Sequence, residues 1–154
     1  MSIEIGKEAP AFKLPANNGE EVSLADFNGK KVVLYFYPKD MTPGCTTQAC
    51  DFRDFSREFE QFNTVILGVS PDPINRHEKF IEKHQLPFLL LSDENHKVAE
   101  DYEVWKLKKN FGKEYMGIER STFIIDEKGT LLKEWRKVRV KDHVNEVLNF
   151  IKEN

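Results

Sequence analysis

The chain has 154 residues, the length of a single domain, and can bury roughly two-thirds of the surface that its unfolded form exposes. Hydrophobic residues make up 40% of the chain and aromatic residues 12%, which excludes a disordered or fibrous protein. The net charge of −3 is small, so we expect no nucleic-acid partner. One local basic cluster, which we expect to be a solvated loop, contains Lys106, Lys108, Lys109 and Lys113.

The sequence also bears on location and on the state of the cysteines. Residues 1–7 show no basic stretch followed by an apolar one, and no apolar run approaches the roughly 18 residues of a membrane span. We therefore expect a cytoplasmic protein without a membrane partner. In that reducing compartment the two cysteines are reactive, metal-binding or simply buried, rather than joined by a permanent disulfide.

The first half of the chain predicts a hairpin, a strand and a helix. Short apolar pieces within residues 9–27 flank Asn17-Asn18-Gly19, a strong turn signal. The apolar run at 31–37 is typical of a strand covered on both faces. Thr42 suits an N-cap and Pro43 the first helical position, so a helix is expected to begin near residue 43. Its apolar stripe would comprise Ala49, Phe52, Phe55, Phe59 and Phe62.

The second half alternates strands and helices and then closes with a hairpin. We expect a strand at 65–69, a helix at 74–84, a strand at 88–91 and a short helix around 97–101, whereas 103–119 should be irregular. Strands at 122–126 and 130–135 form a hairpin, followed by an amphipathic helix at 144–151. The order predicts one thioredoxin-like α/β domain over 1–154, with a mixed central sheet flanked by helices and an N-terminal hairpin.

Cys45 is the chemical centre of this pattern because it falls in the first turn of the helix that begins near residue 43. Unpaired N–H groups and the helix dipole favour a thiolate there, and the thiolate is the nucleophilic form. Complete ionisation would gain only about tenfold over an ordinary thiol at neutral pH. Further rate must come from groups that hold the electrophile, and the Thr42 hydroxyl and the loop N–H groups are candidates. The alternative is that Cys45 is a small buried hydrophobe.

Cys50 lies five residues further along the same helix. That spacing turns it roughly 140° away from Cys45 and separates the two Cα atoms by ~8.6 Å in an intact helix. A disulfide needs Cα atoms within about 7 Å, so a bond between these cysteines would require the helix to unwind locally. If both thiols are reactive, oxidation is coupled to local unfolding; otherwise Cys50 is incidental.

Other candidate sites are weaker. The histidines at 77, 84, 96 and 143 have no metal-ligand spacing, and we expect them at the surface or at helix ends. The two cysteines lack the further ligands of a zinc site, so no metal is expected. No nucleotide-binding glycine motif is present, so no cofactor is expected. Trp105 and Trp135 are interpreted as packing residues.

The segment YFYPKDMTPGCTTQACDFRD resembles the peroxidatic loop and helix of Q-type peroxiredoxins, also called bacterioferritin comigratory proteins. Further similar stretches are LGVSPD at 67–72, LLSDENHKVAEDYEVW at 90–105 and YMGIERSTFIID at 115–126. The resemblance covers nearly the whole chain. It implies a thioredoxin fold and the reduction of hydrogen peroxide or organic hydroperoxides.

The resemblance also implies a role for each matching residue. Cys45 matches the peroxidatic cysteine, which becomes a sulfenic acid, and Cys50 the resolving cysteine that forms an intramolecular disulfide with it. Thr42 matches the threonine that binds the peroxide, and Pro38 the proline that shields the nucleophile. Arg120 matches the arginine that stabilises the thiolate and the leaving oxygen.

The implied partners are a hydroperoxide substrate and thioredoxin or a similar dithiol reductant, in antioxidant defence. A resolving cysteine in the same chain needs no partner subunit, so a monomer is expected. A redox-switched binding module or peroxide sensor that uses the same disulfide is the alternative, whereas the C-x-x-x-x-C spacing disfavours a C-x-x-C disulfide reductase. Two positions depart from the family pattern and have no assigned role: Gln48 replaces a common glutamate and Glu103 a common glycine.

Overall fold

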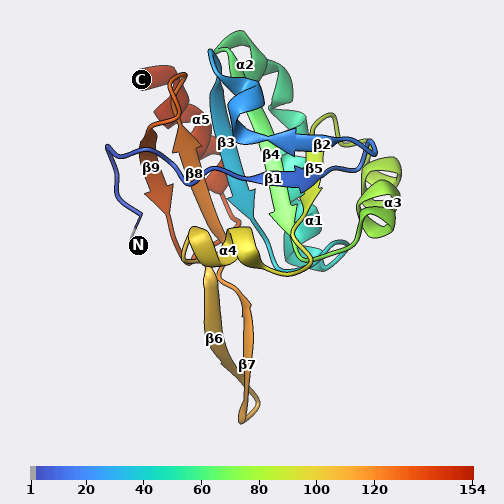
Figure 1. Ribbon diagram of the computed structural model, residues 1–154. Coiled ribbons are helices and arrows are strands. Elements are labelled where there is room, and N and C mark those ends of the chain that lie inside the picture. The colour runs from blue at the N-terminus through green and yellow to red at the C-terminus, as the bar shows by residue number, and fades with distance from the viewer. Residues whose placement is uncertain (1–2) are drawn as a thin grey trace.

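The computed structural model describes residues 3–154; Met1 and Ser2, part of the segment searched for a leader, lie outside it. A mixed sheet with the strand order β5-β4-β3-β8-β9 runs through the centre (Figure 1). β3 pairs in parallel with β4, which pairs in parallel with β5, whereas β8 and β9 continue the sheet antiparallel. The predicted mixed central sheet is thus confirmed. The strands are β3 (Lys31–Phe36), β4 (Thr64–Ser70), β5 (Leu89–Ser92), β8 (Ser121–Ile125) and β9 (Leu131–Trp135).

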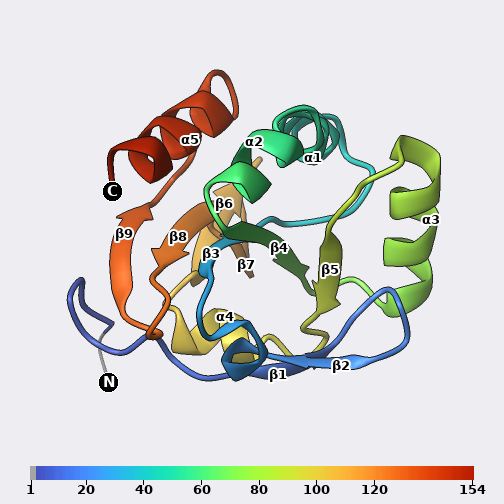
Figure 2. The same ribbon diagram turned by 90° about the horizontal axis from the view of Figure 1, so that it is seen from above.

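Helices and a hairpin cover the two faces of this sheet (Figure 2). On one face lie α1 (Pro43–Asp54), α2 (Ser56–Gln61) and α5 (His143–Glu153). On the other lie the predicted hairpin of β1 (Lys13–Pro15) and β2 (Glu21–Ser23), the 3-10 helix η1 (Leu24–Phe27) and α4 (Lys97–Asp101). The helix α3 (Ile74–His84) has the predicted bounds and lies beside β5.

The central strand β3 is apolar throughout because both of its faces are covered. Val32, Leu34 and Phe36 join the core cluster beneath β1, β2 and α4. Val33 and Tyr35, which point the other way, join the cluster beneath α1, α2 and α5. The alternation divides the core into two clusters, and Cys45 belongs to the one beneath α1, α2 and α5.

The predicted continuous stripe from Ala49 to Phe62 is wrong, because the helix breaks at Phe55. This residue leaves helical geometry at φ −105° and ψ 8°, where α1 ends and α2 begins. Phe52 and Phe59 are fully buried, but Phe62 lies beyond α2 and is 39% exposed.

The expectation that residues 103–119 are irregular is also wrong. They contain a protruding hairpin of β6 (Trp105–Asn110) and β7 (Lys113–Ile118) (Figure 1). Phe111 and Gly112 form its turn with φ of 52° and 78°, the left-handed pair that two-residue hairpin turns require. Phe-Gly is not among the common turn dipeptides, and therefore the sequence did not predict this hairpin.

Glu103 adopts a φ of 59°, a left-handed conformation in which glycine is the least strained residue. This explains the glycine that is common at this position. Its carboxylate accepts a hydrogen bond from the Ile3 N–H at 2.9 Å, and its carbonyl accepts one from Arg136 Nη1 at 2.9 Å.

Within residues 3–154, no helix has both the length and the apolar character needed to cross a membrane.

Candidate active site

The α1 helix begins at Pro43, as predicted, and places Cys45 in its first turn. The Cys45 side chain is almost fully buried, with 2% of its surface exposed. Thr42 occupies the N-cap position, but its hydroxyl does not cap the helix; Thr42 Oγ1 donates to the Lys39 carbonyl at 2.9 Å. With its proton committed there, the hydroxyl oxygen can still accept a hydrogen bond from a bound molecule.

Arg120 contacts the Cys45 thiol although the two residues lie 75 positions apart in the sequence. Its Nη2 lies 3.2 Å from Cys45 Sγ, and its Nη1 donates to Gln48 Oε1 at 2.6 Å. The antiparallel pairing of β3 with β8 produces this contact, because Arg120 immediately precedes β8. Gly44 lies beside the guanidinium, and a Cβ at that position would be 3.4 Å from Arg120 Nη2, an ordinary van der Waals contact.

A second cation stands near this pair. Lys108, on β6, lies close enough to Arg120 and Cys45 that both affect its ionisation. Burial lowers the pKa of Lys108, and the positive charge of Arg120 lowers it further. The sulfur of Cys45 therefore lies at a helix N-terminus with two basic side chains nearby.

Cys50 and Pro38 complete the set of expected site residues. Both are partly buried, and Pro38 belongs to the loop that joins β3 to α1. Cys50 does not face open solvent: its Sγ lies 3.8 Å from His84 Nδ1 at the end of α3. Both thiols are free and belong to one continuous helix, so a bond between them still requires local unwinding.

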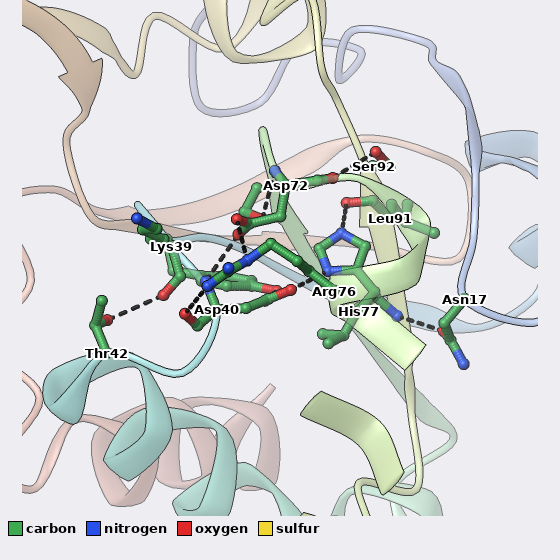
Figure 3. Close-up of polar contacts among 12 residues, drawn as sticks. Asn17, Lys39, Asp40, Thr42, Asp72, Arg76, His77, Leu91 and Ser92 are labelled. Carbon is green, nitrogen blue, oxygen red and sulfur yellow. Dashed lines mark hydrogen bonds and ion pairs between the residues drawn. The ribbon is translucent and has the colours of Figure 1, made fainter. Parts of the chain in front are cut away.

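A buried cluster that sequence reasoning missed lies behind this loop (Figure 3). His77 is fully buried, which makes the expectation of a surface histidine wrong at this position. Its Nδ1 lies 2.6 Å from Asp40 Oδ2, and its Nε2 donates to the Leu91 carbonyl at 2.9 Å. Asp40 also accepts a hydrogen bond from the Tyr37 hydroxyl.

Asp72 joins the cluster from the end of β4. It accepts hydrogen bonds from the Asp40 N–H and the Ser70 hydroxyl, each at 2.7 Å, and it forms an ion pair with Arg76 at 3.2 Å (Figure 3). Asp40, Asp72 and His77 are metal-binding residue types, and one ligand atom of each lies within 4.8 Å of the others. The ligand atoms of Asp40 and His77 already contact each other, and the Asp72 carboxylate is engaged by Ser70, Arg76 and the Asp40 N–H. We therefore interpret the group as an ion-pair cluster that fixes the loop before Cys45.

The sequence did contain one signal for this cluster. Asp40 and Asp72 each follow one of two adjacent parallel strands, β3 and β4, and the carboxyl ends of parallel strands meet at one edge of a sheet. His77 is two turns from the end of α3 and gave no signal of its own.

His143 lies at a helix end, one of the two expected positions, as the first residue of α5; it is buried, with 4% of its area exposed. Thr122 Oγ1 lies 2.8 Å from its Nε2, and the Trp135 ring packs edge-on against it at 5.6 Å. Burial lowers the pKa of His143 to about 4, and the charge of nearby Arg120 acts in the same direction. The imidazole is therefore neutral at physiological pH.

Comparison with known proteins agrees with this geometry. The model of the AhpC/TSA family matches residues 5–134. The chain is 65% identical to peroxiredoxin Bcp of Bacillus subtilis (strain 168) over 153 residues, covering 99% of this chain and 98% of that protein. It is 44% identical to peroxiredoxin Bcp of Escherichia coli (strain K12) over 152 residues, covering 99% and 97% of the two chains.

Solved structures give the same result. The bacterioferritin comigratory protein of Xanthomonas campestris superposes with a TM-score of 0.91 at 38% identity, over 97% of this chain and 98% of that one. A mutant PrxQ of Xylella fastidiosa superposes with a TM-score of 0.94 at 35% identity, over 99% and 98%. These likenesses confirm the expected thioredoxin fold. The chain therefore belongs to the AhpC/TSA family and, within it, to the Bcp or Q-type peroxiredoxins.

Proposed function

We propose that this thiol peroxidase reduces hydrogen peroxide and organic hydroperoxides with Cys45 as its peroxidatic nucleophile. The observation that carries the proposal is the 3.2 Å contact between Arg120 Nη2 and the buried Cys45 sulfur. Arg120 favours the thiolate before the reaction and offers N–H donors to the oxygen that leaves during it.

In the first step the Cys45 thiolate attacks one peroxide oxygen and the O–O bond breaks. The sulfur keeps that oxygen as a sulfenic acid, and the other oxygen leaves as water or an alcohol after it takes a proton. Thr42 accepts a hydrogen bond from the peroxide, because its own proton is donated to Lys39. Pro38 shields the nucleophile, which is consistent with the near-complete burial of Cys45.

In the second step Cys50 attacks the sulfenic sulfur. The S–O bond breaks, water is released and an intrachain disulfide forms. The first turns of α1 must unwind for this, because its two cysteines are too far apart in the intact helix. A thioredoxin-like dithiol then reduces the disulfide and restores both thiols. We also propose a monomer, because resolution within one chain needs no partner subunit. The remaining proposals are a single domain, a cytoplasmic location, a role in antioxidant defence and no nucleic-acid or membrane partner.

The test is steady-state peroxide consumption with thioredoxin, thioredoxin reductase and NADPH. Cys45→Ser should abolish it. Cys50→Ser should still form one sulfenic acid per chain but lose thioredoxin-linked turnover. Mass spectrometry of the oxidised wild type should find Cys45 joined to Cys50 within one chain. A single stoichiometric oxidation without turnover, or a disulfide between two chains, would contradict the proposal.

A further inference from the structure

The third turn of α1 is attached to the end of α3 by two contacts to one residue. Cys50 Sγ lies 3.8 Å from His84 Nδ1, and Arg53 Nη1 donates to the His84 carbonyl at 2.8 Å. The His84 ring is itself oriented by Phe80, which packs edge-on at 5.4 Å. Cys50 therefore has an imidazole neighbour whose position is fixed from both sides.

This part of α1 is also anchored to the core. Ala49 and Phe52 are fully buried, and the Phe52 ring stacks on Tyr35 at a centroid distance of 4.7 Å. Unwinding residues 50–54 would expose Phe52, whereas unwinding residues 43–48 would leave both buried side chains in place. When the helix opens, Cys45 is thus the cysteine that moves, and Cys50 stays beside His84.

Charged and polar groups from three elements surround the His84 imidazole. His84 is the last residue of α3. The Arg53 guanidinium faces it from α1 but is paired with Asp54 Oδ1 at 3.0 Å. Asp51 follows Cys50 on α1, and burial raises the pKa of its carboxyl group. On α3 the neighbouring cation Lys83 is exposed to solvent, and from β3 the Tyr35 hydroxyl lies near Cys50.

We propose that His84 is the general base of the resolving step and takes the Sγ proton of Cys50 as this sulfur attacks Cys45. The inference rests on the proposed function, since it assigns a residue to that reaction. The Cys50 sulfur is oxidised and forms the S–S bond, and the Cys45 sulfur is reduced as its S–O bond breaks. The departing hydroxide takes a proton, directly or through solvent from the imidazolium, and leaves as water.

A base is useful here because Cys50 lies in the third turn of its helix, away from the N-terminal N–H groups that favour the thiolate of Cys45. An unassisted thiol is only a few per cent ionised at neutral pH. We therefore expect His84 to raise the reactivity of Cys50 roughly tenfold near pH 7 and to have no effect at high pH, where the thiol ionises without help.

The first experiment measures alkylation of Cys50 by iodoacetamide against pH in the Cys45→Ser chain, where it is the only cysteine. This needs no peroxidase activity. We expect a rise in rate where an imidazole loses its proton and a second rise where a thiol does. His84→Gln should remove only the first rise, and Lys83→Gln on the exposed side of α3 should retain both. A single rise in the thiol range with His84 present would overturn the proposal, whether or not the His84 variant folds.

The second experiment follows resolution itself after one equivalent of hydrogen peroxide. His84→Gln should form the sulfenic acid at the wild-type rate and convert it to the disulfide about tenfold more slowly at pH 7, with the two chains converging at high pH. A slowing by the same factor at every pH would show a merely structural role and refute the assignment. If no sulfenic acid forms in the wild type, the proposed function itself fails, while the alkylation profile still decides whether His84 activates Cys50.

Discussion

The side chains of Asp40 and His77, both with 0% exposure, meet at 2.6 Å behind the loop that precedes Cys45. Since His77 donates its other ring nitrogen to the Leu91 carbonyl, it has no unused polar atom. Asp40 likewise contacts Tyr37 through its second carboxylate oxygen. The pair joins the loop that follows β3 to α3.

We predict that His77→Ala lowers the free energy of unfolding by about 3–5 kcal/mol, because it leaves the Asp40 carboxylate buried without its partner. Urea unfolding at neutral pH measures this loss. Lys79→Ala, an exposed change on the same helix, is the control and should cost less than about 0.5 kcal/mol. A loss below about 1 kcal/mol for His77→Ala would mean that Asp40 is not held as a buried anion.

Much of the fold could be predicted because its strands are long apolar runs and α3 has a clear stop before Pro87. The two errors in secondary structure have local causes. Phe55 continues the helical spacing of its neighbours, yet the backbone leaves the helix there. The β6–β7 hairpin turns on Phe111 and Gly112, and its exposed strands lack a buried face for an apolar pattern to mark.

The site could be predicted only in part, because its contacts depend on the order of strands in the sheet. Cys45 was identifiable from its position at a helix start. Arg120 lies 75 residues away and was suggested only by family resemblance, since no spacing rule places β8 beside β3. The contact between Cys50 and His84 could not be predicted from the sequence either, because it depends on how α1 and α3 pack against each other.

Arg120 is predicted to act mainly on the step with peroxide. Arg120→Ala should lower the second-order rate of Cys45 oxidation by about 10²–10³, as removal of an oxyanion donor does elsewhere. Arg120→Lys keeps the charge but loses the planar guanidinium, whose two terminal nitrogens contact Cys45 and Gln48. Its rate of oxidation by peroxide should therefore lie between those of the wild type and Arg120→Ala. Stopped-flow oxidation measures both, with the exposed Arg139→Ala as control. A wild-type rate in Arg120→Ala would remove this residue from the site.

His143 should make the fold sensitive to acid. Burial lowers its pKa to about 4, from about 6.5 in the unfolded chain, so the unfolded state binds more protons between these values. Its contribution to stability is complete above about pH 6.5 and is lost as the pH falls towards 4, up to ~3 kcal/mol. Urea unfolding at several pH values should show a smaller acid loss in His143→Asn than in wild type. Parallel curves would indicate that the imidazole is not buried in its neutral form.

The last prediction concerns Tyr35 and Tyr37, which lie on the same side of the sheet but differ in the hydrogen bonding of their hydroxyl groups. Burial raises the pKa of Tyr35 well above its usual value, and its hydroxyl has no hydrogen-bond partner among the described residues, whereas that of Tyr37 donates to Asp40. An unpaired buried hydroxyl costs about 1–3 kcal/mol, so Tyr35→Phe should leave stability unchanged or raise it by about 1 kcal/mol. Tyr37→Phe removes a hydrogen bond to a charged group and should cost about 1.5–3 kcal/mol. Thermal and urea unfolding of both variants test the contrast. A larger loss for Tyr35→Phe than for Tyr37→Phe would show that the Tyr35 hydroxyl does have a partner, such as a buried water molecule.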